Sequence, residues 1–129
     1  MDAFLTLVHR ICEKPVMYVG RCSLRDVSTY LAGYDHAMED QGSSPLPLDG
    51  WLRWVDLRFG ISHPAWHWTR ILLHNYGSDR CALDALPALF EDFFRERQTN
   101  GIDAILAAHR KQLAEGRAPE STTTEDPFP

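Results

Sequence analysis

Apolar side chains recur at intervals of three and four residues along most of the chain, which is the pattern of amphipathic helices. Counting the residues expected to cap or end them, the pattern predicts six helices over residues 2–13, 23–42, 49–60, 64–76, 78–100 and 102–116. The segment KPVMYVGR, residues 14–21, is too short and irregular for a strand and is predicted to be an extended connector. These elements predict an all-α fold, a single-domain bundle of about six helices with a short extended connector after the first.

Several polar residues stand where helices are expected to begin. Ser23 is followed three residues later by Asp26, which resembles a capping box, and Asp49 and Ser78 are candidate caps for the third and fifth helices. Pro87 lies inside the fifth helix, between Leu86 and Phe90 of its apolar stripe. Because proline cannot donate a backbone hydrogen bond, a kink or a break is predicted there.

The length of 129 residues fits one domain. We expect residues 1–115 to form a single helical domain. Residues 116–129 are rich in proline, threonine and acids, so this tail cannot bury enough apolar surface to order itself and is expected to be flexible.

The N-terminus and the cysteines indicate a cytoplasmic protein. No apolar run approaches the ~20 residues that span a bilayer, and the first residues carry Asp2 and no basic region typical of a signal peptide. The three cysteines have no CxxC spacing, which argues against a disulfide scaffold or zinc ribbon. Cys22 stands between Arg21 and Arg25, which favour a thiolate, and its reactivity is left open.

The formal net charge of −5 argues against nucleic-acid binding. Residues 64–76, the second helix of a possible helix-turn-helix pair, hold one arginine and two tryptophans and would make a poor recognition helix. The charge is unevenly spread: residues 35–56 sum to −4 and residues 84–96 to −3. These acidic faces would attract a basic partner, although solvated helix surface is the simpler interpretation of each.

Two sets of side chains have spacings found at catalytic or metal sites. The first has a histidine with acids before and after it, and the second has histidines on one helix; they are Asp35, His36, Glu39 and Asp40, and His63, His67 and His74. The first set lies opposite the apolar stripe and should face solvent, and the second has no cysteine or carboxylate to complete it. We therefore predict no catalytic residues, no metal and no cofactor.

All four tryptophans lie within Trp51–Trp68. Trp66 falls on a different helical face from Trp68, so it is a candidate anchor for a partner. The alternative is a thick core in which all four are partly buried.

Residues 14–37 carry a motif, [KR]-P-x-M-Y-[IV]-G-x-x-S-L followed by G-Y-x-x-A. A second matching stretch is WLRWVDLRFGISHPAWHWTRIL, and a third is ALFEDFF. In these features the chain resembles a group of small bacterial proteins that look like immunity proteins of toxin systems, over roughly residues 4–95. The motif positions are Lys14, Pro15, Met17, Tyr18, Val19, Gly20, Ser23, Leu24, Gly33, Tyr34 and Ala37.

The resemblance implies a protein that binds and neutralises a cognate toxin domain, for example a basic nuclease, by direct contact as a monomer in a 1:1 complex. It implies no catalysis and no binding to nucleic acid or membrane. The shared residues look structural. The proline-rich loop 43–48 and Cys22 depart from the pattern of the group and are particular to this chain. The acidic faces and the candidate anchor are therefore the predicted partner-binding residues: Asp35, His36, Glu39, Asp40, Trp66, Asp84, Glu91 and Asp92.

Two other classes of function stay open. One is a small helical enzyme that uses one of the histidine and carboxylate sets. The other is a regulatory helical module that binds a partner unrelated to toxins.

Overall fold

In the computed structural model, residues 2–61 and 66–122 are described, with side chains up to residue 115. Seven helices lie in these ranges: α1 Asp2–Glu13, α2 Pro15–Val19, α3 Leu24–Asp40, α4 Trp51–Arg58, α5 Trp68–Tyr76, α6 Asp79–Asn100 and α7 Ile102–Thr122. The described residues contain no strand, which confirms the all-α prediction. None of these helices is long and apolar enough to cross a membrane.

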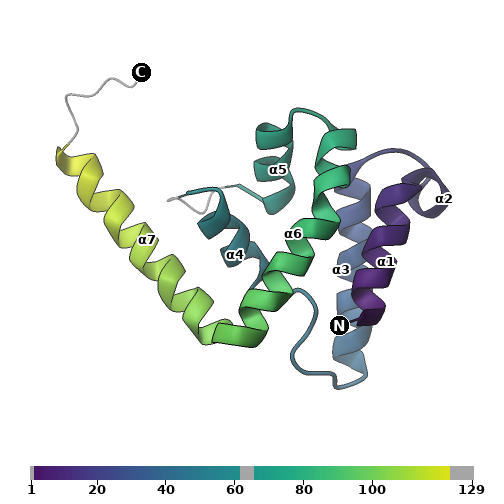
Figure 1. Ribbon diagram of the computed structural model, residues 1–129, viewed down its shortest axis with the longest axis horizontal. Helices are drawn as coiled ribbons and strands as arrows, with labels where there is room; N and C mark the ends of the chain where they lie inside the picture. The colour runs from purple at the N-terminus through teal and green to yellow at the C-terminus, as the bar shows by residue number, and fades with distance from the viewer. Residues whose placement is uncertain (1, 62–65, 123–129) are drawn as a thin grey trace.

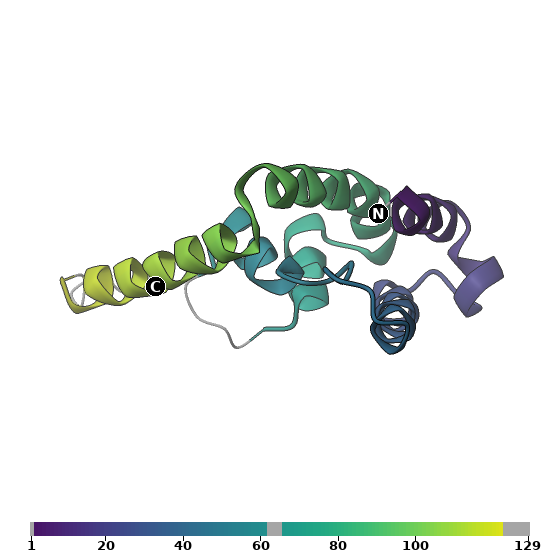
Figure 2. The ribbon, with the colours of Figure 1, turned by 90° about the horizontal axis from the view of Figure 1, so that it is seen from below.

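Helix α6 is the centre of the bundle. It packs against α1, α3, α5 and α7, while α4 lies between α5 and α7 (Figure 1). Seen from below, α2 and the far end of α7 are at opposite extremes of the molecule (Figure 2). The expected apolar stripes of α1, α3 and α6 all face the shared core, which includes Phe4, Val8, Ile11, Leu24, Val27, Leu31, Leu83, Leu86, Phe90 and Phe93.

The tryptophans of α4 and α5 form the aromatic middle of this core. The Trp51 ring stacks on Phe90 with 3.9 Å between ring centroids, and it meets Trp54 and Trp68 at 5.6 and 5.5 Å. Trp51, Trp54 and Trp68 are each at most 5% exposed, so the thick aromatic core is confirmed for these three.

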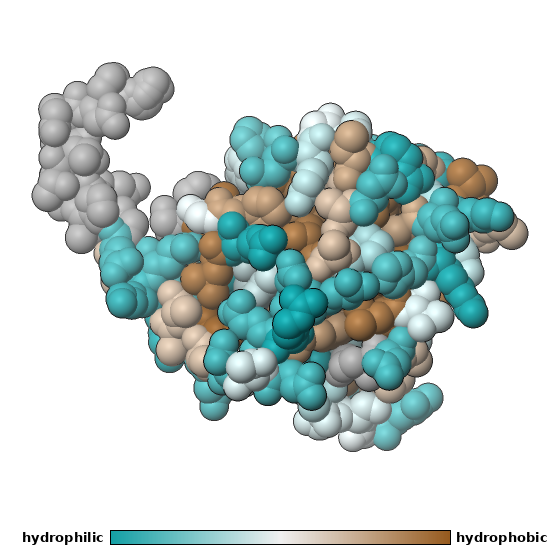
Figure 3. Space-filling view, in the orientation of Figure 1, coloured by the Kyte–Doolittle hydropathy of each residue, from teal (hydrophilic) through white to brown (hydrophobic). Residues whose placement is uncertain are grey.

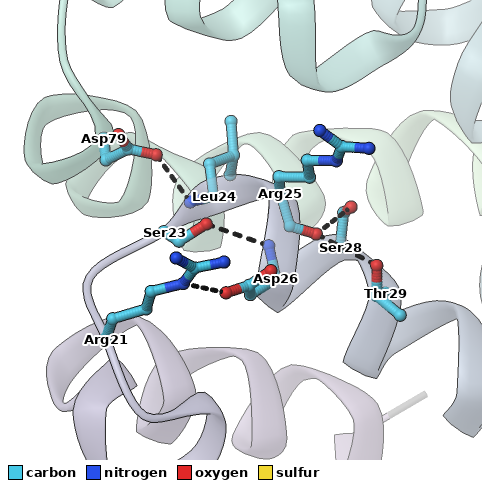
Figure 4. A network of polar contacts seen from close by, with 8 residues as sticks. All are labelled: Arg21, Ser23, Leu24, Arg25, Asp26, Ser28, Thr29 and Asp79. Carbon is cyan, nitrogen blue, oxygen red and sulfur yellow. Dashed lines mark hydrogen bonds and ion pairs between the residues drawn. The ribbon is translucent and has the colours of Figure 1, made fainter.

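Helix α3 begins as its sequence predicts. The Ser23 hydroxyl accepts the Asp26 N–H at 3.1 Å, and the carboxylate of Asp79, from α6, accepts the Leu24 N–H at 2.7 Å (Figure 4). The Arg21 guanidinium donates to the Asp26 carboxylate, and this hydrogen bond lowers the pKa of Asp26. The same contacts therefore cap α3 and join it to the start of α6.

The prediction of an extended connector over residues 14–21 is wrong in part, because residues 15–19 form the short helix α2. Pro15 is the first helical residue, where its fixed φ suits the helix and its missing N–H costs nothing. Gly20 ends the helix with φ +88°, a left-handed conformation that favours glycine.

The starts of α4 and α5 also differ from the prediction. Gly50, not Asp49, is the N-cap of α4, and Asp49 instead accepts the Leu46 N–H at 2.8 Å within the preceding turn. Helix α5 begins at Trp68, not at Pro64, which lies outside the described residues. His67 caps it by accepting the Thr69 N–H through Nδ1.

The last two helices run further than expected. The predicted break at Pro87 is wrong, because α6 is continuous from Asp79 to Asn100 and buried apolar side chains hold it on both sides of the proline. A kink at Pro87 stays a prediction. Helix α7 passes the expected end at Gly116 and reaches Thr122. The domain limit at residue 115 and the flexibility of the tail stay predictions.

Candidate interaction surfaces

The four predicted binding residues of α3 divide into two kinds. The Asp35 carboxylate turns to the following loop and accepts the Leu48 N–H at 2.8 Å, so it holds the loop in place. His36, Glu39 and Asp40 are exposed, with side-chain exposures of 73, 64 and 72%, and the imidazole lies 3.8 and 3.9 Å from the two carboxylates. Among the described residues, no lysine or arginine pairs with these two acids.

Glu39 and Asp40 end α3, where the negative end of the helix dipole disfavours acids. We therefore predict that the double variant Glu39→Gln/Asp40→Asn is more stable than wild type. Its free energy of unfolding should be about 0.3–1 kcal/mol larger at low ionic strength. Urea unfolding followed by tryptophan fluorescence would measure this. Asp26→Asn, at the other end of the same helix, is the matched control and should destabilise. Equal effects of the two variants, or a gain unchanged in 0.5 M salt, would contradict the electrostatic explanation.

The acids of α6 have polar or basic neighbours, two of them at helical spacing on α6 itself and two from distant parts of the chain. Glu91 lies 2.8 Å from the His9 imidazole, and Asp92 lies 3.5 Å from Arg58 and 2.9 Å from Arg95. Asp84 pairs with Arg80 at 2.8 Å. These pairs reduce the field of the α6 face, so of the two acidic faces the end of α3 is the less compensated one.

Trp66 is half-buried and packs against the core rather than projecting alone. The Arg70 guanidinium lies 4.2 Å from its ring centroid, and the His74 ring meets it edge-on at 5.4 Å. Contact with a partner at this position stays a prediction.

The two described members of the second histidine set have separate structural roles. His67 caps α5 and burial lowers its pKa, His74 packs on Trp66, and His63 lies outside the described residues. Among the described residues, no group of three or more histidine, cysteine, aspartate or glutamate side chains is placed to hold a metal ion.

A histidine–carboxylate pair that the sequence analysis missed lies between α4 and α7. His109 Nε2 is 3.0 Å from Asp56 Oδ2, and the two residues are 4% and 1% exposed. Next to it, the Gln112 amide donates to the Asp56 and Ile61 carbonyls at 3.1 and 2.7 Å. The signal was present in the sequence, since His109 follows Ile105 by four residues on the buried face of α7. Its near-complete burial makes this pair a structural link.

An open groove of about 1150 Å³ lies where α1, α3, α6 and the start of α7 meet. Its apolar lining comes from Leu5, Met38, Pro45, Phe94 and Ile102. The sequence pattern did not predict this groove, because its walls come from five separate parts of the chain.

The carboxylates of Asp2 and Glu91 also line the groove, as do Arg95 and Arg97. The cationic groups of both arginines have partners: Arg95 pairs with Asp92, and Arg97 Nη1 donates to backbone carbonyls of the neighbouring loop. Glu91 of α6 and Met38 in the last turn of α3 therefore border one groove.

A second exposed feature is the short helix α2. Val16, Met17 and Tyr18 are 61, 76 and 37% exposed, and Tyr30 of α3 is 40% exposed. We call these four residues the α2 surface. Hydrophobic side chains reach the surface over α2 at the right-hand edge of Figure 3, next to hydrophilic ones. Met17 and Tyr18 belong to the motif that looked structural, yet both point outward. Tyr30 could have been found, because it lies off the 3–4 stripe of its helix.

Comparisons with protein-family models, curated proteins and solved structures gave no match. The fold and its surfaces define an all-α protein with a partly apolar groove and a projecting apolar helix. Exposed apolar features of this kind are typical of proteins that bind other proteins.

Proposed function

We propose that the chain is an immunity-type inhibitor that neutralises a bacterial toxin domain by direct contact, without catalysis. The observation that carries the proposal is the groove at the meeting point of α1, α3 and α6. Its lining is partly apolar, and a protein partner gains most of its binding energy by burying a few large side chains in such a place. The resemblance of the sequence to immunity-like proteins supports the same class.

The charges around the groove favour a basic partner. Asp2 and Glu91 line it, while the two lining arginines, Arg95 and Arg97, already have partners within the fold. The groove therefore fits an apolar side chain flanked by lysine or arginine, as a basic toxin surface would present. Local charge of this kind accelerates association and selects the partner more than it adds affinity.

Inhibition without catalysis is supported by the structural roles of two candidate catalytic side chains and of one buried histidine–carboxylate pair. Asp35 binds the backbone of a loop, and His67 caps a helix. The buried Asp56 and His109 side chains bind each other and link two helices. Each of these groups stabilises the fold.

Co-expression with the product of the neighbouring toxin gene tests the proposal. Wild type should restore growth and form a 1:1 complex with that product. Glu91→Lys should weaken the complex about tenfold or more, which corresponds to about 1.4 kcal/mol. The matched control is Glu115→Lys, because Glu115 is also an exposed glutamate with one neighbouring partner, Lys111, and lies on α7 away from the groove.

Two outcomes would overturn the proposal. One is a wild-type chain that neither binds the neighbouring product nor restores growth. The other is a complex that both charge reversals weaken equally, since the groove would then have no special part. Circular dichroism of each variant shows whether its fold is retained.

A further inference from the structure

The α2 surface is convex and apolar. Val16, Met17 and Tyr18 follow one another, so they point in directions about 100° apart around the helix. All three are exposed, which means that α2 projects from the body on most of its circumference (Figures 1 and 2). They and Tyr30 are the large apolar side chains that the described part of the chain leaves most open to solvent.

The α2 surface is held in a defined position. Pro15 is buried beneath it, and the half-buried Val19 packs against the core. The Tyr18 ring meets Tyr30 edge-on with 6.1 Å between centroids, which joins α2 to α3. Because the backbone of α2 is already fixed, it loses little conformational entropy on binding. More of the free energy gained by burying its apolar side chains then contributes to affinity.

The local charge has the opposite sign to the whole chain. Residues 10–30 contain four basic side chains, Arg10, Lys14, Arg21 and Arg25, and two acidic ones, Glu13 and Asp26, so they sum to +2 in a chain of −5. Lys14 and Arg21 stand at the two ends of α2, and Arg21 faces Asp26 (Figure 4). The exposed Lys14 has no ion pair with a described residue.

We infer that the α2 surface is a docking site for a protein segment that is apolar at its centre and acidic around it. Tyrosine, methionine and arginine are the side chains enriched at the centres of protein interfaces, and three of the four residues here are tyrosine or methionine. The exposed Lys14 and the positive net charge of residues 10–30 select acidic surroundings on the partner. This surface lies at the far end of α1 from the groove, and the two prefer partners of opposite charge, so the inference goes beyond the proposed function.

Two synthetic helical peptides test the inference on the intact, isotope-labelled protein. Both carry leucine and tryptophan on one face, and their remaining positions are all glutamate in one and all lysine in the other. The glutamate peptide should shift the amide NMR resonances of residues 14–21 and 28–31 and bind about tenfold tighter than its lysine twin in low salt. Raising the salt to 0.5 M should remove most of that difference.

Three variants locate the contact. Met17→Ser should weaken binding of the glutamate peptide about fivefold or more, because it removes the most exposed apolar side chain. Lys14→Glu should reduce or reverse the preference for the glutamate peptide. Lys111→Glu makes the same charge change at a 78% exposed side chain on α7 and should leave binding unchanged.

Several outcomes would overturn the inference. Equal binding of the two peptides would mean that charge does not select the partner, and shifts confined to the groove would place the contact elsewhere. Absence of binding would refute the site directly. Binding only to phosphatidylglycerol vesicles would assign the surface to a membrane, and a Met17-dependent dimer in ultracentrifugation would assign it to a second copy of the chain.

Discussion

Replacing His109 by leucine should lower the free energy of unfolding by about 3–5 kcal/mol, because it removes the imidazole from a carboxylate that is almost fully buried. Asp56 is 1% exposed, and among the described residues the Arg53 guanidinium lies 4.0 Å from the same carboxylate oxygen. The loss would also loosen α7, which the pair joins to α4. Urea unfolding followed by tryptophan fluorescence measures the change, since Trp54 is on the same short helix as Asp56.

A double-mutant cycle separates the pair from the packing around it. Asp56→Leu/His109→Leu should cost clearly less than the sum of the two single variants, because no buried charge is left. Arg110→Leu, at the next and exposed position of α7, should change stability by no more than about 0.5 kcal/mol. A His109→Leu variant as stable as Arg110→Leu would refute a stabilising role for the pair.

Arg97→Met should destabilise the protein by about 2–4 kcal/mol and release the loop before α4. The buried guanidinium donates from Nη1 to the carbonyls of Leu46 at 2.7 Å and Asp49 at 2.9 Å, and it lies about 5 Å from the Phe93 and Phe94 ring centroids. Burial lowers the pKa of Arg97, and the nearby acids Asp49 and Asp35 oppose that shift. Without this side chain, carbonyl groups lose a charged donor that water replaces poorly at a covered position.

Arg97→Lys keeps the positive charge and removes the planar guanidinium, so it tests whether the geometry of the N–H donors contributes to stability in addition to the charge. It should recover only part of the loss, since one ammonium cannot reproduce the planar geometry. Arg95→Met, two residues earlier and 70% exposed, is the control and should have a small effect. Thermal unfolding and amide NMR of residues 43–49 would measure both effects. If Arg97→Met left the loop resonances unchanged, the loop would have to be held by other contacts.

The features that local sequence determines were predicted well. The apolar spacing of α1 and the serines that precede α3 and α6 act within one or two turns, and the structure confirms these starts. Helix α2 was missed because a helix of five residues has no stripe to detect, and the burial of Pro15 depends on its tertiary surroundings.

The surfaces could be predicted less well, because they depend on which segments meet. Glu91 was identified as an acidic residue, but its partner His9 lies 82 residues away in sequence. The sequence predicted Asp35 to be a solvated acid. In the structure its carboxylate accepts the Leu48 N–H, because the following loop folds back against α3. Periodicity shows which face of a helix is polar, and it does not show what that face contacts.

The loop between α3 and α4 is held through its main chain, by Asp35 on one side and by Arg97 on the other. Its own side chains at Ser43, Ser44 and Pro45 face the groove and carry none of these bonds. Evolution can therefore change this wall of the groove by substituting residues of the loop, at little cost to the fold. Under the proposed function, such substitutions would change which partner is recognised while Asp35 and Arg97 are retained.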